Sequence, residues 1–263
     1  MEIAEISKYN LAFLRSFFQP LRFTIAVEAI LEGSSHGAIW MDNLTHPTLV
    51  VLWDFADGIY IVSQEKDKKH LNGINSLFQQ TIIPEVEKRD EVPLFVVYIS
   101  PVFNENEIRS IFGPEWDVSK EKASFYEFPL VEFPSEKQLH ELPPSLEGNL
   151  MDMDLFQDSS IQYIDVLREE IESDWDSIEN FLTHSFGYYI RDLDRNSLAS
   201  WVIVGKIAQS CAELGIKTVE QYQRQGLGQF AAQELIKYTL ERELVPHWYC
   251  FQNNVLSANM VKN

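Results

Sequence analysis

Short apolar runs, three in a row and separated by turn-forming residues, occur twice in this chain and constrain its fold more than any other feature. The first set is GAIWMD, PTLVVLWD and GIYIVS, and the second is YYIRDL, SLASWVIVGKIA and CAELGIKTV. Such runs predict consecutive strands of an antiparallel meander. Apolar residues at helical spacing precede and follow each set, so each half of the chain is predicted to form an α/β unit of the α+β type.

Prolines mark the best position for a linker between these halves. Residues 129–148 contain four prolines and one glycine, a composition typical of connecting segments. We therefore expect an N-terminal α/β domain over residues 1–145 and a second domain over residues 146–263. The order of elements is similar in the two, but no sequence identity between them proves a duplication.

The charge of the chain limits its partners. With a formal net charge of −19, it lacks the clustered lysines and arginines that nucleic-acid phosphates require. The negative electrostatic field of the protein favours cationic ligands instead. Eleven acids and one base lie between residues 147 and 179, on the polar side of a predicted amphipathic helix, where solvation is the simplest explanation.

Neither the N-terminus nor the apolar runs indicate export or a membrane. The sequence MEIAEISKYN lacks the basic and then apolar order of a signal peptide. No apolar run is long enough to span a bilayer. The two cysteines, Cys211 and Cys250, are too few for a disulfide framework. We expect a soluble, cytoplasmic protein with no bound metal, and the oligomeric state is left open.

Two short motifs fit familiar patterns but not their required context. Residues 33–37, GSSHG, match the G-x-S-x-G nucleophile elbow, yet helix precedes and strand follows them, which reverses the order the elbow needs. Residues 226–231, GLGQFA, match a dinucleotide fingerprint between strand and helix. The next strand, LVPHWYCF, ends without the acid that would hold a ribose. Both interpretations are therefore disfavoured.

A wider pattern, Q/R-x-x-G-x-G/A, is satisfied by Gln223, Gly226 and Gly228. The start of a helix offers unpaired amide groups and the positive end of its dipole, which suit a pyrophosphate. Glycines there remove the Cβ atoms that would obstruct a close approach. The same glycines could equally form a plain turn, and the motif alone does not decide between these hypotheses.

The wider sequence resembles the GNAT superfamily of acetyl-CoA-dependent N-acyltransferases. The resemblance is carried by FLTHSFGYYI and by ELGIKTVEQYQRQGLGQFAAQELIKYTLERELVPHWYCFQNNVLS, with VEAILEGSSHGAIWMDNLTHPTLVVLWD in the first half. More narrowly, the chain is similar to the bacterial GNAT acetyltransferase family that includes the zwittermicin A resistance proteins. The resemblance implies a C-terminal GNAT fold with a mixed, mainly antiparallel sheet, together with an N-terminal α/β domain. Whether that N-terminal domain is a degenerate GNAT-like one is left open.

The resemblance also implies roles for particular residues. Ile216, Lys217 and Thr218 would pair through their backbone with the pantetheine of acetyl-CoA, on a strand that separates from its neighbour. The turn that would wrap the pyrophosphate comprises Gln223, Arg224, Gln225, Gly226, Leu227, Gly228 and Gln229. Asn254 matches an asparagine that reaches the pantetheine arm, and Ser257 is expected to pack or cap.

The chemistry of acyl transfer needs a base for the amine and a proton for the leaving thiolate. Glu213 is the candidate base, and the alternative is a carboxylate that only pairs with a nearby cation. The family's acid is a tyrosine on the last helix, but the matching position here is Val261. Backbone donors or another tyrosine, such as Tyr222 or Tyr249, would have to replace it.

A second departure concerns the end of the domain. GNAT domains normally continue through two more strands, which this sequence does not contain after the last predicted helix. The sequence is therefore expected to be either truncated or that of a shortened relative, and a truncation would open one wall of the acceptor site. The resemblance implies an N-acetyltransferase that transfers acetyl from acetyl-CoA to a primary amine of a small cationic acceptor by direct attack. The alternative is an inactive acyl-CoA-binding or regulatory protein.

Overall fold

The computed structural model describes residues 4–5, 11–21, 25–55, 58–89, 95–114, 116–120, 123–127, 141–254 and 257. The chain divides into two compact units, Met1–Lys120 and Glu121–Asn263. This division lies before the boundary expected after residue 145, because a strand at residues 123–127 belongs to the sheet of the second unit. Most of the proline-rich stretch, residues 128–140, falls outside the described residues.

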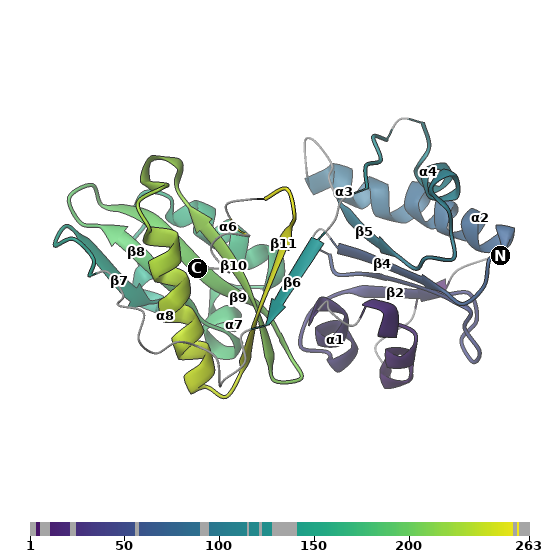
Figure 1. The fold of residues 1–263 in the computed structure, drawn as a ribbon, viewed down its shortest axis with the longest axis horizontal. Coiled ribbons are helices and arrows are strands. Elements are labelled where there is room, and N and C mark those ends of the chain that lie inside the picture. The colour runs from purple at the N-terminus through teal and green to yellow at the C-terminus, as the bar shows by residue number, and fades with distance from the viewer. Residues whose placement is uncertain are drawn as a thin grey trace. The chain divides into compact units, whose positions relative to one another are not determined.

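The N-terminal unit is a five-stranded sheet with helices on both faces (Figure 1). Its elements are β1 (Ala4–Glu5), η1 (Leu11–Ser16), η2 (Gln19–Leu21), α1 (Ile25–Glu32), β2 (Ala38–Met41), β3 (Leu49–Trp53), β4 (Gly58–Ser63), α2 (Lys68–Leu77), the π-helical turn η3 (Phe78–Ile82), α3 (Ile83–Arg89), β5 (Val96–Ile99) and α4 (Glu105–Phe112). The strand order is β1-β2-β3-β4-β5. Strands β2 to β4 form the predicted meander, and β5 is parallel to β4.

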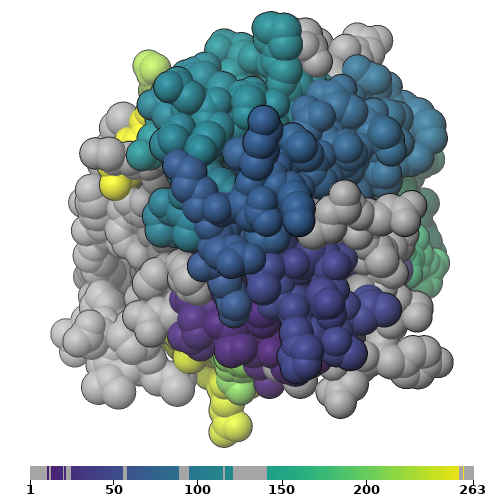
Figure 2. Space-filling model, turned by 90° about the vertical axis from the view of Figure 1, so that its right-hand side faces the viewer, coloured from purple at the N-terminus to yellow at the C-terminus, as the bar shows by residue number. Residues whose placement is uncertain are grey.

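Two apolar clusters hold this unit together. One joins α2, η3, α3 and α4 to one face of the sheet, and the other joins η1 and α1 to the opposite face. Purple, blue and teal residues of this unit cover much of the surface drawn in Figure 2. Helix α4 follows local sequence signals, because Asn104 caps its start with a capping box and Gly113 ends it. The GSSHG turn follows α1 and precedes β2, the reverse of a nucleophile elbow.

The C-terminal unit is built around a six-stranded sheet. Its elements are β6 (Ala123–Glu127), β7 (Leu146–Leu150), α5 (Met153–Gln157), α6 (Ile164–Asp174), α7 (Ile178–His184), β8 (Gly187–Asp192), β9 (Ser197–Ala208), β10 (Cys211–Thr218), η4 (Glu220–Tyr222), α8 (Leu227–Glu241) and β11 (Val245–Phe251). The strand order is β6-β11-β10-β9-β8-β7. All neighbouring strands are antiparallel except β10 and β11, which run parallel.

The two faces of this sheet carry different helices. Helix α8 packs on one face against Val202, Leu214 and Trp248, while α6 and α7 pack on the other against Trp201 and Ile203. Side chains alternate between the faces along each strand. The odd-numbered residues of β10 and β11 from Glu213 and His247 onward therefore point to the α6 side.

The two units share one order of elements. From β1 in one unit and from β7 in the other, a strand is followed by helices, a three-strand meander, a helix, and a strand parallel to the last meander strand; β6 has no counterpart in this order. The similar outline expected from sequence is thus a similar topology as well. Among the helices that the structure describes, none is both long and apolar enough to cross a membrane.

Candidate functional site

Strands β10 and β11 begin as a paired ladder and then separate. The pairing runs from Cys211–Val245 to Leu214–Trp248, while β10 continues through residues 215–218. Beyond Leu214, β10 stays paired with β9 on its other side. Residues 215–218 therefore present one backbone edge toward the gap between the strands (Figure 1). Ile216, Lys217 and Thr218, the residues expected to pair with pantetheine, all lie in this segment.

The far side of β11 is covered. Strand β6 pairs antiparallel with β11 from His247–Glu127 to Phe251–Ala123. The far edge of β11, where an open wall was considered, is therefore occupied by β6, the first strand of the C-terminal unit. Because edge strands expose unpaired backbone groups, this pairing also protects β11.

A row of ionisable residues crosses the sheet where the strands begin to separate. Glu213 is the Cα partner of Lys206 on β9 and of His247 on β11. Partners on adjacent strands point to one face, so these three side chains are neighbours. The β9–β10 register shifts between Glu213 and Leu214, a bulge of the kind that re-aims side chains beside active sites. Glu213 is half-buried, and His247 was not predicted as a site residue.

The glycine turn leads directly into α8. Gly226 precedes this helix with a φ of 80°, and no side chain caps it. Arg224 before it also has a positive φ, 61°. A Cβ built on Gly226 would meet nothing within 4 Å, so the space before the helix is open. The first amides of α8, those of Leu227, Gly228 and Gln229, thus face this space without carbonyl partners inside the helix.

The glutamines of the turn donate hydrogen bonds to backbone carbonyls that lie shortly before it. Gln223 Nε2 donates to Thr218 O at 3.3 Å, and Gln225 Nε2 donates to Gln221 O at 3.2 Å. Both side chains are exposed, as is that of Arg224. The structure therefore brings together the turn and the end of β10 that the resemblance assigned to one ligand.

The two tyrosines considered as acids differ in position. The Tyr222 hydroxyl is buried and donates to Asp192 Oδ2 at 2.8 Å. Burial and this carboxylate raise the pKa of Tyr222. The bond holds the hydroxyl at Asp192 on β8, which is separated from β10 by β9. Tyr249 lies on the separated part of β11, two residues after His247 and on the same face.

The last predicted site residue, Asn254, turns toward the chain itself. Its Oδ1 accepts a hydrogen bond from Ser257 N at 3.1 Å. Ser257 in turn accepts a bond from Trp248 Nε1 at 2.9 Å, which agrees with a packing role. Val261, the position that matches the family's tyrosine, lies outside the described residues.

Two acids of α6 approach the same face of the sheet and were not predicted. Trp201 Nε1 donates to Glu170 Oε2 at 3.1 Å, and Lys217 Nζ lies 3.7 Å from that oxygen. One turn further, Asp174 Oδ1 pairs with Lys206 Nζ at 2.8 Å. Burial raises the pKa of Glu170. In the sequence these acids are indistinguishable from the solvated ones beside them.

In the N-terminal unit, the protein's own residues occupy the place that corresponds to the gap between β10 and β11. The β4–β5 ladder ends at Ile61–Ile99. Just beyond it, Ser100 Oγ accepts from Ser63 N at 3.1 Å and donates to Ser63 O at 3.3 Å. Asp67 caps the following helix by accepting from Lys69 N. The strand edge and the helix start that are open in the C-terminal unit are both closed here.

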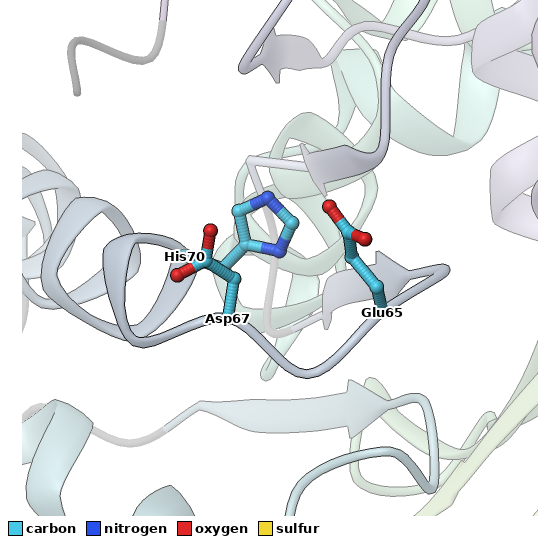
Figure 3. Close-up of side chains that lie close together, drawn as sticks. All are labelled: Glu65, Asp67 and His70. Carbon is cyan, nitrogen blue, oxygen red and sulfur yellow. The ribbon is translucent and has the colours of Figure 1, made fainter.

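Near that closed helix start, Glu65, Asp67 and His70 bring potential metal-ligating atoms within 4.8 Å of one another (Figure 3). Each ring nitrogen of His70 already has a protein partner, Nδ1 with Ser63 Oγ at 2.9 Å and Nε2 with Thr48 Oγ1 at 3.2 Å. Because Asp67 is engaged as a helix cap, we assign this cluster a structural role.

A groove of 710 Å³ lies at the opposite edge of the sheet, between β7, β8 and α8, and is lined by Glu147, Gly148, Asn149, Leu150, Asp152, Tyr188, Tyr189, Glu234, Lys237, Tyr238 and Glu241. Burial raises the pKa of Tyr188 to about 12. None of the predicted site residues lines this groove. The gap between β10 and β11 therefore remains the candidate site.

These features define a GNAT-type acyltransferase, and residues 15–263 match the family described as GNAT acetyltransferase. The chain belongs to that family. It is similar to the uncharacterized N-acetyltransferase YdfB of Bacillus subtilis (strain 168), with 21% identity over 248 residues, 94% of this chain and 88% of YdfB.

Solved structures share the fold over nearly the whole chain. A GCN5-related N-acetyltransferase-like protein from Streptococcus suis superposes with a TM-score of 0.65 at 17% identity, covering 96% of this chain and 92% of that protein. A tandem GNAT protein from the clavulanic acid biosynthesis pathway gives a TM-score of 0.52 at 10% identity, covering 99% and 93%.

Proposed function

We propose that this chain transfers an acetyl group from acetyl-CoA to a primary amine of a small cationic acceptor. The observation that carries the proposal is the gap between β10 and β11, which opens beside the uncapped start of α8. A free strand edge can pair with the amides of an extended ligand. A helix start attracts its phosphates. Acetyl-CoA has both kinds of group, the amides of its pantetheine arm and the phosphates of its pyrophosphate.

The donor would be held by backbone more than by side chains. In this arrangement residues 215–218 pair with pantetheine, and the amides of Leu227, Gly228 and Gln229 bind the pyrophosphate. Gly226 leaves room for the phosphates, because even a Cβ atom at this position would meet nothing within 4 Å. Arg224 adds a positive charge at the turn. Asn254 contributes by capping the segment after β11 through its bond from Ser257 N.

Glu213 would act as the base. Acetyl-CoA supplies a thioester, whose carbonyl carbon bonds to the amine nitrogen while its bond to sulfur breaks. The amine must first lose a proton, and Glu213 takes it, directly or through water. The departing thiolate would take a proton from Tyr249 on the same face. The nitrogen would lose its second proton as the amide forms, and that proton would restore the tyrosine. The products are the acetamide and free CoA, with one proton released overall.

The acidic character of the protein supports a cationic acceptor, because a negative field raises the local concentration of ammonium ions. No clustered basic surface is expected, so nucleic acid is not proposed as a partner. The reaction as written needs no metal.

The test has two stages. Calorimetry with acetyl-CoA measures binding, and a thiol-release assay over a panel of primary amines then measures transfer. The expected result is binding followed by CoA release with at least one cationic amine. Absence of acetyl-CoA binding would overturn the proposal. Binding without thiol release from any amine would favour the inactive acyl-CoA-binding alternative.

A further inference from the structure

We propose that the carboxylate of Glu170 is an ammonium-binding subsite for the acceptor, and that the ammonium of Lys217 occupies it until an acceptor replaces it. The inference rests on the proposed transferase function. Its structural basis is the arrangement of Glu170 on α6 between the indole of Trp201 and the side chain of Lys217.

The Glu170 carboxylate is fixed from the sheet side. Trp201 is fully buried, and its indole N–H donates to Glu170 Oε2 at 3.1 Å. The Glu170 side chain is 28% exposed, so it is largely withdrawn from water. A carboxylate in such a place needs a cation to offset its lost hydration. Lys217 supplies that cation from the adjacent strand.

The two ion pairs of α6 differ in a way that separates a structural pair from a replaceable one. Lys206 Nζ lies 2.8 Å from Asp174 Oδ1, and its side chain is 8% exposed. Lys217 Nζ lies 3.7 Å from Glu170 Oε2, beyond a normal hydrogen bond, and its side chain is 50% exposed. A long, hydrated pair contributes little stability. An incoming alkylammonium ion can therefore exchange with Lys217 at small cost.

The subsite also lies on the face of the sheet that carries the proposed base. Lys217 belongs to the segment of β10 that is proposed to hold the donor, and its Cα partner on β9 is Trp201. Lys217 lies four positions after Glu213 on the same strand, so both side chains point to the α6 face. An amine at Glu170 is thus on the face that carries the proposed base.

Two variants are expected to change the acceptor KM in opposite directions. Glu170→Gln keeps the shape but loses the charge, and should raise the acceptor KM by about tenfold or more. Lys217→Met removes the resident ammonium, and should lower the acceptor KM because nothing competes for Glu170. The calorimetric affinity for acetyl-CoA should change little in Glu170→Gln. Glu172→Gln, an exposed position on the same helix, is the matched control and should leave the acceptor KM unchanged.

An unchanged acceptor KM in Glu170→Gln, or a raised one in Lys217→Met, would overturn the subsite. A second measurement does not depend on turnover. Thermal unfolding is compared in n-propylammonium chloride and in potassium chloride at equal concentration. A ligand that binds the folded state raises the midpoint, so wild type should gain stability in the alkylammonium salt and Glu170→Gln should not. Equal gains in both proteins would refute the subsite even if no amine is acetylated, whereas failed turnover alone counts against the proposed function.

Discussion

Glu213 on β10 and His247 on β11 are Cα partners in the parallel ladder, one pair before that ladder ends. They thus lie side by side where the two strands begin to separate, with Lys206 completing the row on β9. The gap that opens beyond them is bordered by residues 215–218, which pair with β9 but not with β11. This relationship places a candidate base at the closed end of the proposed donor site.

Replacing Glu213 with glutamine should lower kcat by roughly 10²- to 10⁴-fold, the usual contribution of a general base. The side chain keeps its size, so the affinity for acetyl-CoA in calorimetry should be unchanged. Steady-state kinetics from pH 6 to 9 would check this, since a lost base also changes the pH profile. A variant with wild-type kcat throughout that range would show that Glu213 is a paired structural carboxylate.

Glu213 and His247 should behave as a coupled pair. Charged or polar neighbours in one row interact, so the effects of Glu213→Gln and His247→Gln on kcat/KM should not add in the double variant. A four-protein kinetic cycle measures the coupling. Exposed His184 on α7 offers a control, because His184→Gln should be additive with Glu213→Gln. Strict additivity for His247 would mean that the register brings the two residues close without functional interaction.

Two substitutions of Gly226 should separate backbone strain from charge. At a φ of 80°, alanine is strained and should cost about 1 kcal/mol of unfolding free energy, while acetyl-CoA still binds. Glutamate carries the same strain and adds a negative charge, so Gly226→Glu should prevent binding. Urea unfolding and calorimetry provide the two readouts. If Gly226→Glu binds acetyl-CoA as tightly as Gly226→Ala, the pyrophosphate lies elsewhere.

Each chain should bind one molecule of acetyl-CoA, because Ser100 closes the corresponding strand edge of the N-terminal unit. Ser100 is 3% exposed. Its replacement by alanine leaves Ser63 N–H without that partner, and should cost about 1–3 kcal/mol. Denaturant unfolding measures the loss, and calorimetry should still report one site. Two sites in wild type would contradict the closed state of this edge.

The stability of the N-terminal unit should depend on Asp42 and fall in acid. Burial alone would raise its pKa, but bonds from Leu49 N and from the hydroxyl and N–H of Thr48 outweigh burial, and the pKa is lowered. A lowered folded-state pKa stabilises the protein above the unfolded-state value, near 4, and this stabilisation is lost as pH falls through the folded-state pKa. The difference in unfolding free energy between wild type and Asp42→Asn should thus become smaller from pH 6 to pH 3. A constant difference would exclude this linkage.

Much of the fold could be predicted from local sequence. Strand β9 spans the predicted run from Ser197 to Ala208, and α4 begins and ends at local signals, the Asn104 capping box and Gly113. These features depend on side-chain periodicity and capping, which operate over a few residues. The same holds for the glycine turn, since the positive φ of Gly226 is a local backbone demand.

Tertiary structure decided what depends on pairing between distant segments. Whether β11 has a covered edge is settled by β6, more than a hundred residues earlier, through backbone hydrogen bonds that carry little sequence signal. The partnership of Glu213 with His247 follows from strand register, and the selection of Glu170 from a run of acids follows from its contact with Trp201. Sequence thus determined the elements and the turn, because those obey short-range physics. Only the folded sheet determined which ionisable residues meet, because burial and proximity arise from packing.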